Sequence, residues 1–518
     1  MDRLPPQRND GTAPSRPPEA GAGRRRETRR TPLRHRWRGH YAASVAIAIT
    51  ALSPFIMVST AAAMFAGDLR ADLQMSRFAV QLIAGLAIAG YAFGALTAGD
   101  LVQRFRQRYL FFLCEGLFVL GSVATAMAPD VAVYGIGRIA SGFATGLLLV
   151  IAVPPVIQHF PPERLRTTFI WINIGFFGAT CIGPLLGGAV AALHAWRLLF
   201  AGLGAVALGN LLAAYLVLPV TDPPNPKLRL DPFAGVLGIT SVVLPFFATA
   251  ELTRHGFAAM PFVLPLAAGL ACFVALILSQ HHQREPLSPV DRMWTTISVT
   301  GVMVAMIGGS VFVALLDLAQ QLQLSVVHRT PLATGILFTP QVGGVLVTAV
   351  LLGRLLQTRY LPLLILFGMA CLGGAGLMLL ATGADGATLP TLFTALLLGL
   401  GAGATVAPGM LLAGMPVASR ILGRVFALVE LVRSLADFVM APVVMKLADV
   451  SSTTAPLDWH GIATGTRVTL WIAACFVVVG IGLWLAGGAG LPRPDIRGWI
   501  AEGGTGLDSP RLFARLRG

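Results

Sequence analysis

The sequence predicts an all-α polytopic membrane protein with fourteen spanning helices. Of its 518 residues, 55% are hydrophobic and only 12% are charged, and the mean hydropathy is +0.74. A soluble domain of this size would need far more polar surface. Apolar runs of about 20 residues, the length that a helix needs to cross the hydrocarbon core, recur along the chain between charged or proline-rich breaks. Helices are expected because lipid offers free backbone groups no partner.

The first 40 residues differ in composition from the rest of the chain. They hold eleven arginines and four acidic residues, with Pro and Gly between them and few large apolar side chains. Such a segment cannot bury enough apolar surface to fold, so residues 1–40 are predicted to form a disordered basic tail. Because much of the net charge of +14 lies in this tail, we expect no nucleic-acid partner.

Reading the apolar runs in order gives fourteen predicted spans. The first is too long for the apolar region of a secretory signal, so it is assigned to the membrane domain. The seventh and eighth are short and each contains a proline. The predicted spans are 42–65, 78–98, 109–128, 132–153, 168–193, 198–218, 234–250, 261–279, 295–316, 332–353, 361–381, 389–410, 425–446 and 468–489.

The basic residues predict the orientation of these spans. With the N-terminus inside, 29 of the 38 Lys and Arg residues lie on the inner side, seven lie outside and two lie within spans. Lys and Arg concentrate in cytoplasmic loops. We therefore expect a multi-pass protein of the cell membrane, surrounded by lipid, with both termini in the cytoplasm.

A short internal repeat divides the spans into two groups. The segment GDLVQRFRQRYLFF, from Gly99, is echoed by GRLLQTRYLPLL, from Gly353. Many secondary transporters are built from two such repeats around a site at the membrane midplane. The predicted parts are the tail 1–40, a first six-span bundle 41–218, a linker with two extra spans 219–293, a second six-span bundle 294–490 and a cytoplasmic tail 491–518.

The fifth predicted span contains several glycines and a central proline. Gly175, Gly178, Gly183, Gly187 and Gly188 are expected to let a neighbouring backbone approach closely. Pro184 removes one helical hydrogen bond and permits a bend. A plain helix-packing seam explains the same pattern.

This span carries a family resemblance. GFFGATCIGPLLGG, followed by WRLLF from Trp196, resembles the fifth-helix motif of drug:proton antiporters of the major facilitator superfamily, in its fourteen-span branch. The resemblance covers residues 41–490 and implies the major facilitator fold, with two six-helix bundles and two extra central helices. It implies that Gly178, Gly183, Pro184, Gly187 and Gly188 form a bendable, leak-tight packing surface.

Two further stretches resemble family motifs with departures. GDLVQRFRQR is similar to the loop motif after the second span at Gly99, Leu101, Arg104, Phe105 and Arg108, but it has Gln103 and Arg106 where the family has Asp and Gly. GRIASGFATG is similar to the fourth-span motif at Arg138 and Gly142. The acidic residue that this branch carries in its first span is missing. Proton coupling cannot be assigned to that position.

Three ionisable residues share one stripe of the thirteenth predicted span. Glu430, Arg433 and Asp437 are spaced three and four residues apart, so they are neighbours on a helix surface. One arginine cannot neutralise two carboxylates, and charged groups in a membrane cost several kcal/mol unless paired or hydrated. The spare carboxylate is a candidate for binding and releasing a proton. A static ion-pair ladder is the alternative.

Other polar groups in spans are weaker candidates. Arg138 is expected to handle protons, as the family resemblance implies, or to pair with an interior carbonyl or carboxylate. Glu115 is a further proton-coupling candidate. Asp317, Gln320 and Gln321 are candidates for the substrate cavity, although Asp317 also suits the headgroup region and the glutamines also suit a loop.

The remaining motifs argue against other classes of protein. The chain has two lysines, neither of which follows a glycine, so no phosphate-binding loop for ATP is present. The five cysteines are widely separated and lie in apolar segments, which predicts reduced packing residues and no metal site. We expect neither an enzyme nor a cofactor, with the proton gradient as the energy source.

The sequence therefore predicts a secondary transporter, expected to be monomeric, that exports small amphipathic or lipophilic compounds in exchange for protons. A proton symporter that imports an organic acid or siderophore-like compound is the alternative within transport. A non-transporting membrane receptor or scaffold is the alternative from another class. The substrate itself is not predicted, because fold resemblance does not set specificity.

Overall fold

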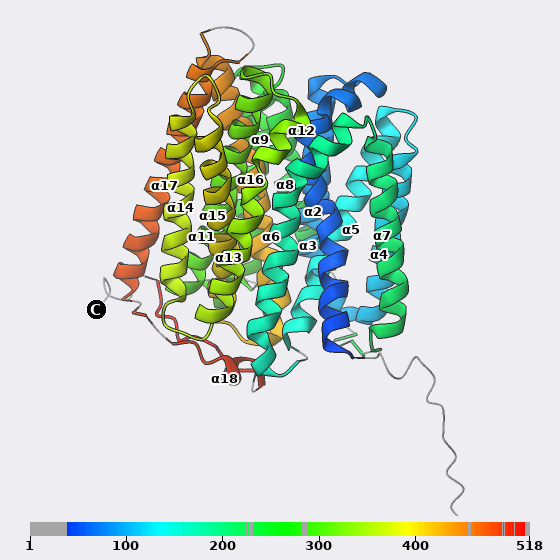
Figure 1. Cartoon of the computed structure of the whole chain (residues 1–518). Coiled ribbons are helices and arrows are strands. Elements are labelled where there is room, and N and C mark those ends of the chain that lie inside the picture. The colour runs from blue at the N-terminus through cyan, green and yellow to red at the C-terminus, as the bar shows by residue number, and fades with distance from the viewer. Residues whose placement is uncertain are drawn as a thin grey trace, which may run out of the picture.

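The computed structural model describes residues 39–512, except 159, 221, 224, 227–230, 282–288, 454–456, 489, 492 and 502. Most of the predicted tail 1–40, and parts of the segments 219–293 and 491–518, therefore lie outside the described residues. The described residues form long helices that run side by side, and no sheet (Figure 1). The predicted all-α fold is confirmed.

Eight long helices make up the first part of the chain. Their termini carry local signals: the Ser76 side chain caps α3 by accepting a bond from the Ala79 amide at 3.1 Å, and Asp231 caps α8. The helices are α2 (Tyr41–Asp72), α3 (Arg77–Arg104), α4 (Gln107–Ala126), α5 (Val131–Gln158), α6 (Leu165–Ala192, preceded by the turn η1, Pro162–Arg164), α7 (Trp196–Val217), α8 (Pro232–Glu251) and α9 (Met260–His281).

The second part begins with the short helix α10. It continues through α11 and a π-helical segment, η2, and ends with the short helix α18. The elements are α10 (Val290–Met293), α11 (Thr296–Gln321), η2 (Leu322–Val326), α12 (Pro331–Leu337), α13 (Pro340–Leu355), α14 (Leu361–Thr382), α15 (Thr388–Gly414), η3 (Ser419–Ile421), α16 (Leu422–Ser451), α17 (Trp459–Gly487) and α18 (Ile496–Ala501).

Thirteen of the described helical segments are long and apolar enough to cross a membrane. α16 is not one of them, because charged residues are spread along its 30 residues: Arg424, Glu430, Arg433, Asp437, Lys446 and Asp449. It nevertheless packs among α3, α8, α11 and α17 in the same bundle. With α16 included, the long segments agree with the predicted count of fourteen.

The tenth predicted span, 332–353, is not one continuous helix. It consists of α12 and α13, which are separated at Phe338 and Thr339. Pro340 contributes to the break because it has no N–H to donate to the preceding turn, although Phe338 and Thr339 keep helical backbone angles.

The long helices pack as two halves with two extra helices beside them. α2–α7 pack on one another, and so do α11 and α13–α17. Across the halves, α3 packs on α16, and α6 packs on α12 and α13. α12 and α13 together form the tenth span. If the second half repeats α2–α7 in order, α12–α13 corresponds to α3 and α16 corresponds to α6. The contact of α3 with α16 is then equivalent by two-fold symmetry to the contact of α6 with α12–α13. The residue bounds of the predicted bundles stay a prediction.

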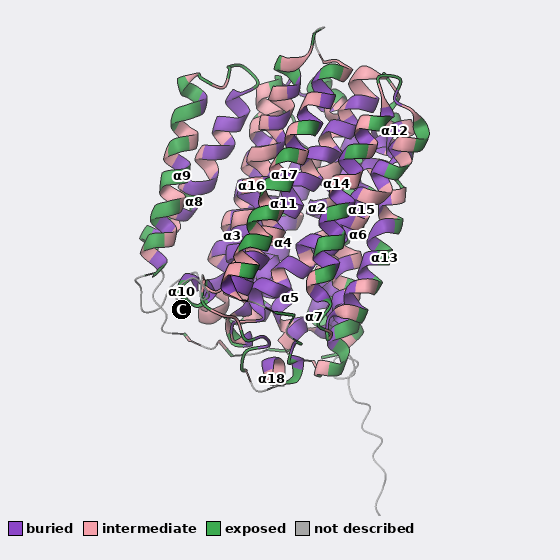
Figure 2. Ribbon diagram, turned by 90° about the vertical axis from the view of Figure 1, so that its left-hand side faces the viewer, coloured by how far each residue is buried: buried purple, intermediate pink, exposed green. Residues whose placement is uncertain are grey.

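The extra helices α8 and α9 lie at one edge of the bundle (Figure 2). α8 packs on both α3 and α16, so it covers the seam between the halves. Phe246 of α8 meets Phe438 of α16 with ring centroids 4.9 Å apart. α9 packs mainly on α8, and much of its surface is exposed.

Both described ends of the chain lie at the same face of the bundle (Figure 1). We call this the terminal face; it carries the start of α2 at Tyr41 and the short helix α18. The other end of the bundle is called the opposite face. An even number of spans requires this arrangement of the ends.

Candidate functional site

The Glu430, Arg433 and Asp437 side chains of α16 are joined into one charged cluster, which we call the α16 triad. Arg433 donates to both carboxylates: its Nε lies 3.1 Å from Glu430 Oε2, its Nη1 lies 2.5 Å from Asp437 Oδ2, and its Nη2 bonds Glu430 Oε1. Both carboxylates are buried. One guanidinium thus serves two carboxylates, as the spacing predicted.

α11 completes the surroundings of Asp437. The Ser310 hydroxyl donates to Asp437 Oδ1 at 3.0 Å. A Cβ on Gly309 would lie only 2.8 Å from the same oxygen, so a larger residue there would displace the carboxylate. The Gly309–Ser310 pair therefore both makes room for Asp437 and binds it.

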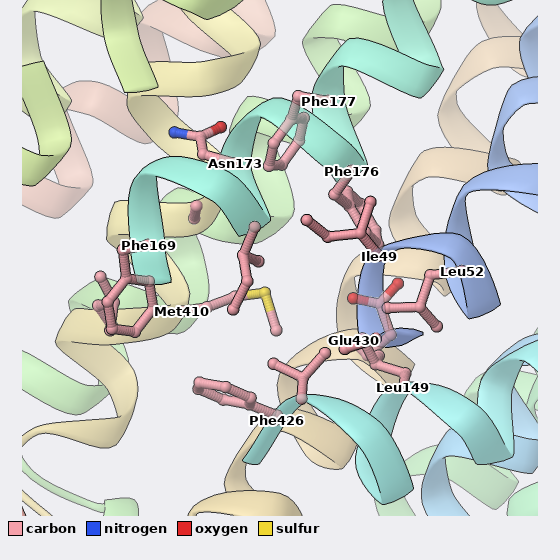
Figure 3. A pocket seen from close by; sticks show the side chains of 15 residues that line it. Ile49, Leu52, Leu149, Phe169, Asn173, Phe176, Phe177, Met410, Phe426 and Glu430 are labelled. Carbon is pink, nitrogen blue, oxygen red and sulfur yellow. The ribbon is translucent and has the colours of Figure 1, made fainter. Parts of the chain in front are cut away.

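Glu430 also faces a cavity between the two halves. α2, α5 and α6 line it on one side and α15 and α16 on the other, and Glu430 and Asn173 are the polar side chains among its lining residues. Figure 3 shows the Glu430 carboxylate beside Leu52 and Leu149, with Asn173 farther away. The lining residues are Ala48, Ile49, Leu52, Leu149, Val153, Phe169, Ile172, Asn173, Phe176, Phe177, Ala407, Met410, Leu411, Phe426 and Glu430.

Asn173 links the halves at this cavity. Its Nδ2 donates to the Gly403 carbonyl of α15 at 3.1 Å, whereas its Oδ1 is buried without a hydrogen-bond partner among the described residues. The wall of the cavity is thus apolar and partly aromatic, and the two polar side chains that line it, Asn173 and Glu430, are almost fully buried. Such a surface fits a molecule with few polar groups.

Arg138 lies apart from the α16 triad. Its guanidinium lies over the rings of Phe55 and Phe200, 5.2 and 5.4 Å from their centroids. It is buried and forms no hydrogen bond or ion pair with the described residues. The predicted pairing with an interior carbonyl or carboxylate is therefore not observed there.

Glu115 belongs to a separate polar network in the first half. Its Oε1 accepts a bond from Asn210 Nδ2 at 3.0 Å, and Asn210 Oδ1 accepts one from Thr50 at 2.6 Å. Glu115 Oε2 has no hydrogen-bond partner among the described residues. The structure therefore does not bring Glu115 to the α16 triad, and its role in proton coupling stays a prediction.

The three predicted cavity residues of α11 do not line the cavity between the halves. Asp317 is half-buried, Gln320 is buried with an unpartnered Nε2, and Gln321 accepts a bond from Ser325 at 2.7 Å. Gln320 and Gln321 lie inside α11, not in a loop. Their part in substrate binding stays a prediction.

The glycines of α6 face two neighbours. Gly183 and Gly187 lie against α2, where added Cβ atoms would meet Thr60 and Ala61, and Gly188 lies against Pro331 of α12 in the other half. Gly178 differs, because the nearest atom to its added Cβ is 4.0 Å away in its own helix. α6 therefore packs closely on both halves, but Gly178 takes no part in the seam.

Pro184 leaves one backbone carbonyl of α6 without its helical donor, and α2 supplies a donor in its place. Proline has no N–H, so the carbonyl four residues earlier, that of Thr180, loses its helical donor. The Thr60 hydroxyl of α2 donates to this carbonyl at 2.7 Å. Closer to the start of both helices, Ser53 of α2 donates to the Gly175 carbonyl of α6 at 3.2 Å. The first-span hydroxyls thus hold α6 in place.

The loop motif after α3 contains a cross-half ion pair. Asp100 Oδ1 lies 3.1 Å from Arg424 Nη2 at the start of α16, and both side chains are largely buried. Gln103, where the family resemblance implies an acid, lines a pocket beside this pair. The acid that joins the halves is therefore Asp100, three residues earlier.

The other motif residues pack within the first half. The Arg108 guanidinium donates to the Tyr215 carbonyl of α7 at 2.7 Å, and Arg104 lies over Phe105. A Cβ on Gly142 would meet the Ala87 carbonyl of α3, and Gly99 is buried in α3. Arg108 and Gly142 thus join helices of the first half.

Sequence reasoning missed several residues that the structure places in these contacts. Asn173 and Asn210 are buried amides in spans, and such groups are a recognisable signal in a membrane helix. Asp100 and Ser310 carry no comparable signal, because their importance depends on partners far away in the chain.

The fold and the site define a class of protein: a polytopic membrane protein with two helical halves and a cavity between them. The sequence profile of the Major Facilitator Superfamily matches residues 45–441. The chain belongs to this superfamily, and the resemblance found in the sequence is confirmed.

Named relatives agree with this assignment. The chain is 27% identical to a "Multidrug resistance protein B homolog" and 28% identical to "Multidrug resistance protein Stp", both of Mycobacterium tuberculosis (strain ATCC 25618 / H37Rv). The matches cover 60% and 57% of this chain and 58% and 54% of those proteins. The chain thus spans little more than half the length of the curated relatives it matches.

Solved structures are similar in fold. The proton:xylose symporter XylE matches with a TM-score of 0.58 at 15% identity, over 86% of this chain and 95% of that chain. At this identity the match concerns the fold alone.

Proposed function

We propose that the protein is a proton-coupled exporter of small amphipathic or lipophilic compounds that works by alternating access. The α16 triad carries this proposal, because Glu430 is one of the residues that line the apolar cavity, Arg433 joins it to Asp437, and Asp437 accepts a bond from Ser310 of α11. A proton on one carboxylate would weaken its bond to Arg433 and so alter both the cavity wall and the α11–α16 contact. The relatives named as multidrug resistance proteins support export.

The same proposal includes the location, orientation and energy source of the protein. The protein would lie in the plasma membrane as a monomer surrounded by lipid, with the terminal face toward the cytoplasm. The proton gradient would supply the energy, with no cofactor. The predicted excess of Lys and Arg in the inner loops supports this orientation.

The test uses inverted vesicles with an imposed pH gradient. Replacing both acids, Asp437→Asn with Glu430→Gln, should reduce gradient-driven flux to the level seen without a gradient, because no carboxylate remains in the triad to exchange a proton. Asp449→Asn is the matched control, since Asp449 is an exposed acid on the same helix. It should leave the flux unchanged.

The double variant leaves the largely buried Arg433 without its two carboxylate partners, which destabilises a protein. A triple variant that adds Arg433→Gln removes all three charges and separates lost coupling from lost folding. Unchanged gradient-driven flux in either folded variant would remove the triad from the mechanism.

A proton symporter for an organic acid is the second candidate. Arg138 favours it, because this buried guanidinium makes no ion pair with the described residues and would suit a carboxylate. Under import, substrate would move with the protons in the same vesicles, whereas export requires opposite directions. Direction measured in vesicles therefore decides between them.

A further inference from the structure

The segment after α17 folds back onto the terminal face. We call residues 493–512, of which 502 is outside the described part, the C-terminal strap; it contains α18. Trp499 has no exposed surface, and Ile496 and Leu507 are nearly as deeply buried. All three belong to the same hydrophobic core as Met415 and Val417 of the α15–α16 loop. The strap is thus part of the packed protein.

Directional bonds fix the strap to two elements of the second half. At the α15–α16 loop, Trp499 Nε1 donates to the Val417 carbonyl at 2.9 Å and the Gly506 amide donates to the Met415 carbonyl at 2.7 Å. At the start of α11, the Thr296 amide donates to the Pro510 carbonyl at 3.0 Å. The Ile297 amide donates to the Ser509 hydroxyl at 2.9 Å.

The same loop also carries the contacts to the first half. Two residues after Val417, the Ser419 carbonyl accepts a bond from Gln158 of α5 at 2.5 Å. Arg424 then forms the buried ion pair with Asp100 of α3. Arg497 of the strap lies 3.5 Å from Glu163, beside α6, although both of these side chains are exposed.

We propose that Trp499 is a positioning residue for the closed terminal face. It holds the α15–α16 loop where Ser419 and Arg424 reach the first half, and so the strap favours states in which the halves are joined at this face. Loss of Trp499 frees the loop and shifts the protein toward states open at the terminal face. This rests on the proposed alternating access, but not on which residue carries the proton.

The experiment measures distances across the halves in the full-length protein. Spin labels are placed by Tyr109→Cys and Tyr360→Cys at exposed positions on the terminal face, and by Met127→Cys and Leu389→Cys on the opposite face. The five native cysteines are replaced beforehand. Trp499→Ala should move the terminal-face distances to longer values and the opposite-face distances to shorter ones.

Two further variants keep the test decisive. Trp499→Phe keeps an aromatic ring but loses the bond to Val417, so it should shift the same distances less, and it serves if Trp499→Ala fails to fold. Trp471→Ala, at an exposed tryptophan of α17, is the matched control and should shift neither pair.

A role in stability alone would lower the melting temperature and leave both distance distributions unchanged, which would overturn the proposal. Failure of proton-coupled export is a separate outcome, because it would show in the flux of the triad variants while the label distances still responded to Trp499→Ala.

Discussion

Thr60 of α2 replaces a hydrogen bond that Pro184 removes from α6. The proline leaves the Thr180 carbonyl without its helical donor, and the Thr60 hydroxyl of α2 replaces that donor at 2.7 Å. A free carbonyl cannot bond to lipid. The proline therefore becomes tolerable only while α2 and α6 stay together.

We expect Thr60→Val to cost roughly 0.6–1.7 kcal/mol of stability, the range for hydrogen bonds between membrane helices. In a Pro184→Ala background the same change should cost much less, because alanine restores a backbone N–H that can bond to the Thr180 carbonyl. A double-mutant cycle on the free energy of unfolding measures the difference. An equal cost of Thr60→Val in both backgrounds would contradict this explanation.

At the residue scale, the sequence identified the triad but not its partners. Glu430, Arg433 and Asp437 could be grouped because helical spacing is local. The Ser310–Asp437 bond joins residues 127 positions apart, and Asp100 and Arg424 are 324 apart. No local pattern predicts such pairs, because they depend on how helices pack.

At the scale of elements, α6 is a helix that packs closely on both halves. Gly183 and Gly187 lie against α2, and Gly188 lies against α12. Close backbone approach of this kind is a main source of helix association in lipid. Gly178 is the exception, and it provides a matched control on the same helix.

Gly187→Ala should destabilise the protein by about 1–3 kcal/mol, the usual cost of overpacking, because the new methyl group would overlap the Ala61 backbone of α2. Gly178→Ala should be nearly neutral, since the nearest atom to its added Cβ is 4.0 Å away. Thermal unfolding and vesicle flux measure both. Equal losses in the two variants would show that α2 and α6 do not pack in this way.

Most spans could be predicted because length and hydropathy are properties of short segments. Two features of the structure could not be predicted from the length and hydropathy of short segments. Pro340 divides the tenth span into α12 and α13, and the predicted tail 491–518 contains the fully buried Trp499. Burial of Trp499 requires the α15–α16 loop, whose Val417 lies 82 residues earlier in the chain.

At the scale of the whole molecule, the halves are joined on both sides of the cavity. Asp100 and Arg424 join them near the terminal face, and α6 and α12 pack closely where Gly188 meets Pro331. A transporter that alternates must break one set of these contacts while it keeps the other. The Asp100–Arg424 pair is thus expected to hold the terminal face closed.

Asp100→Asn should weaken this closed state by about 3–5 kcal/mol, because it removes the carboxylate that pairs with the largely buried Arg424. Arg424→Gln should weaken the closed state in the same direction. The exchanged pair, Asp100→Arg with Arg424→Asp, should recover part of the loss. Label distances across the terminal face report the effect. Arg106→Gln is the control, because it breaks an exposed pair with Asp222 and such pairs contribute little; an equal effect there would contradict the prediction.

The two halves could be inferred from the repeat after Gly99 and Gly353, and the membrane class from composition. The cavity could not be inferred, because its lining comes from five helices of both halves. Substrate identity depends on that lining and not on the fold. This is why sequence reasoning reached the transporter class and stopped before the substrate.

The most direct test of the account follows protons and substrate together in vesicles that contain the purified protein. The account predicts that substrate entering a vesicle drives protons out, and that Asp437→Asn with Glu430→Gln stops this exchange while the folded protein still binds substrate. Movement of both in the same direction, or exchange that persists in the double variant, would contradict it.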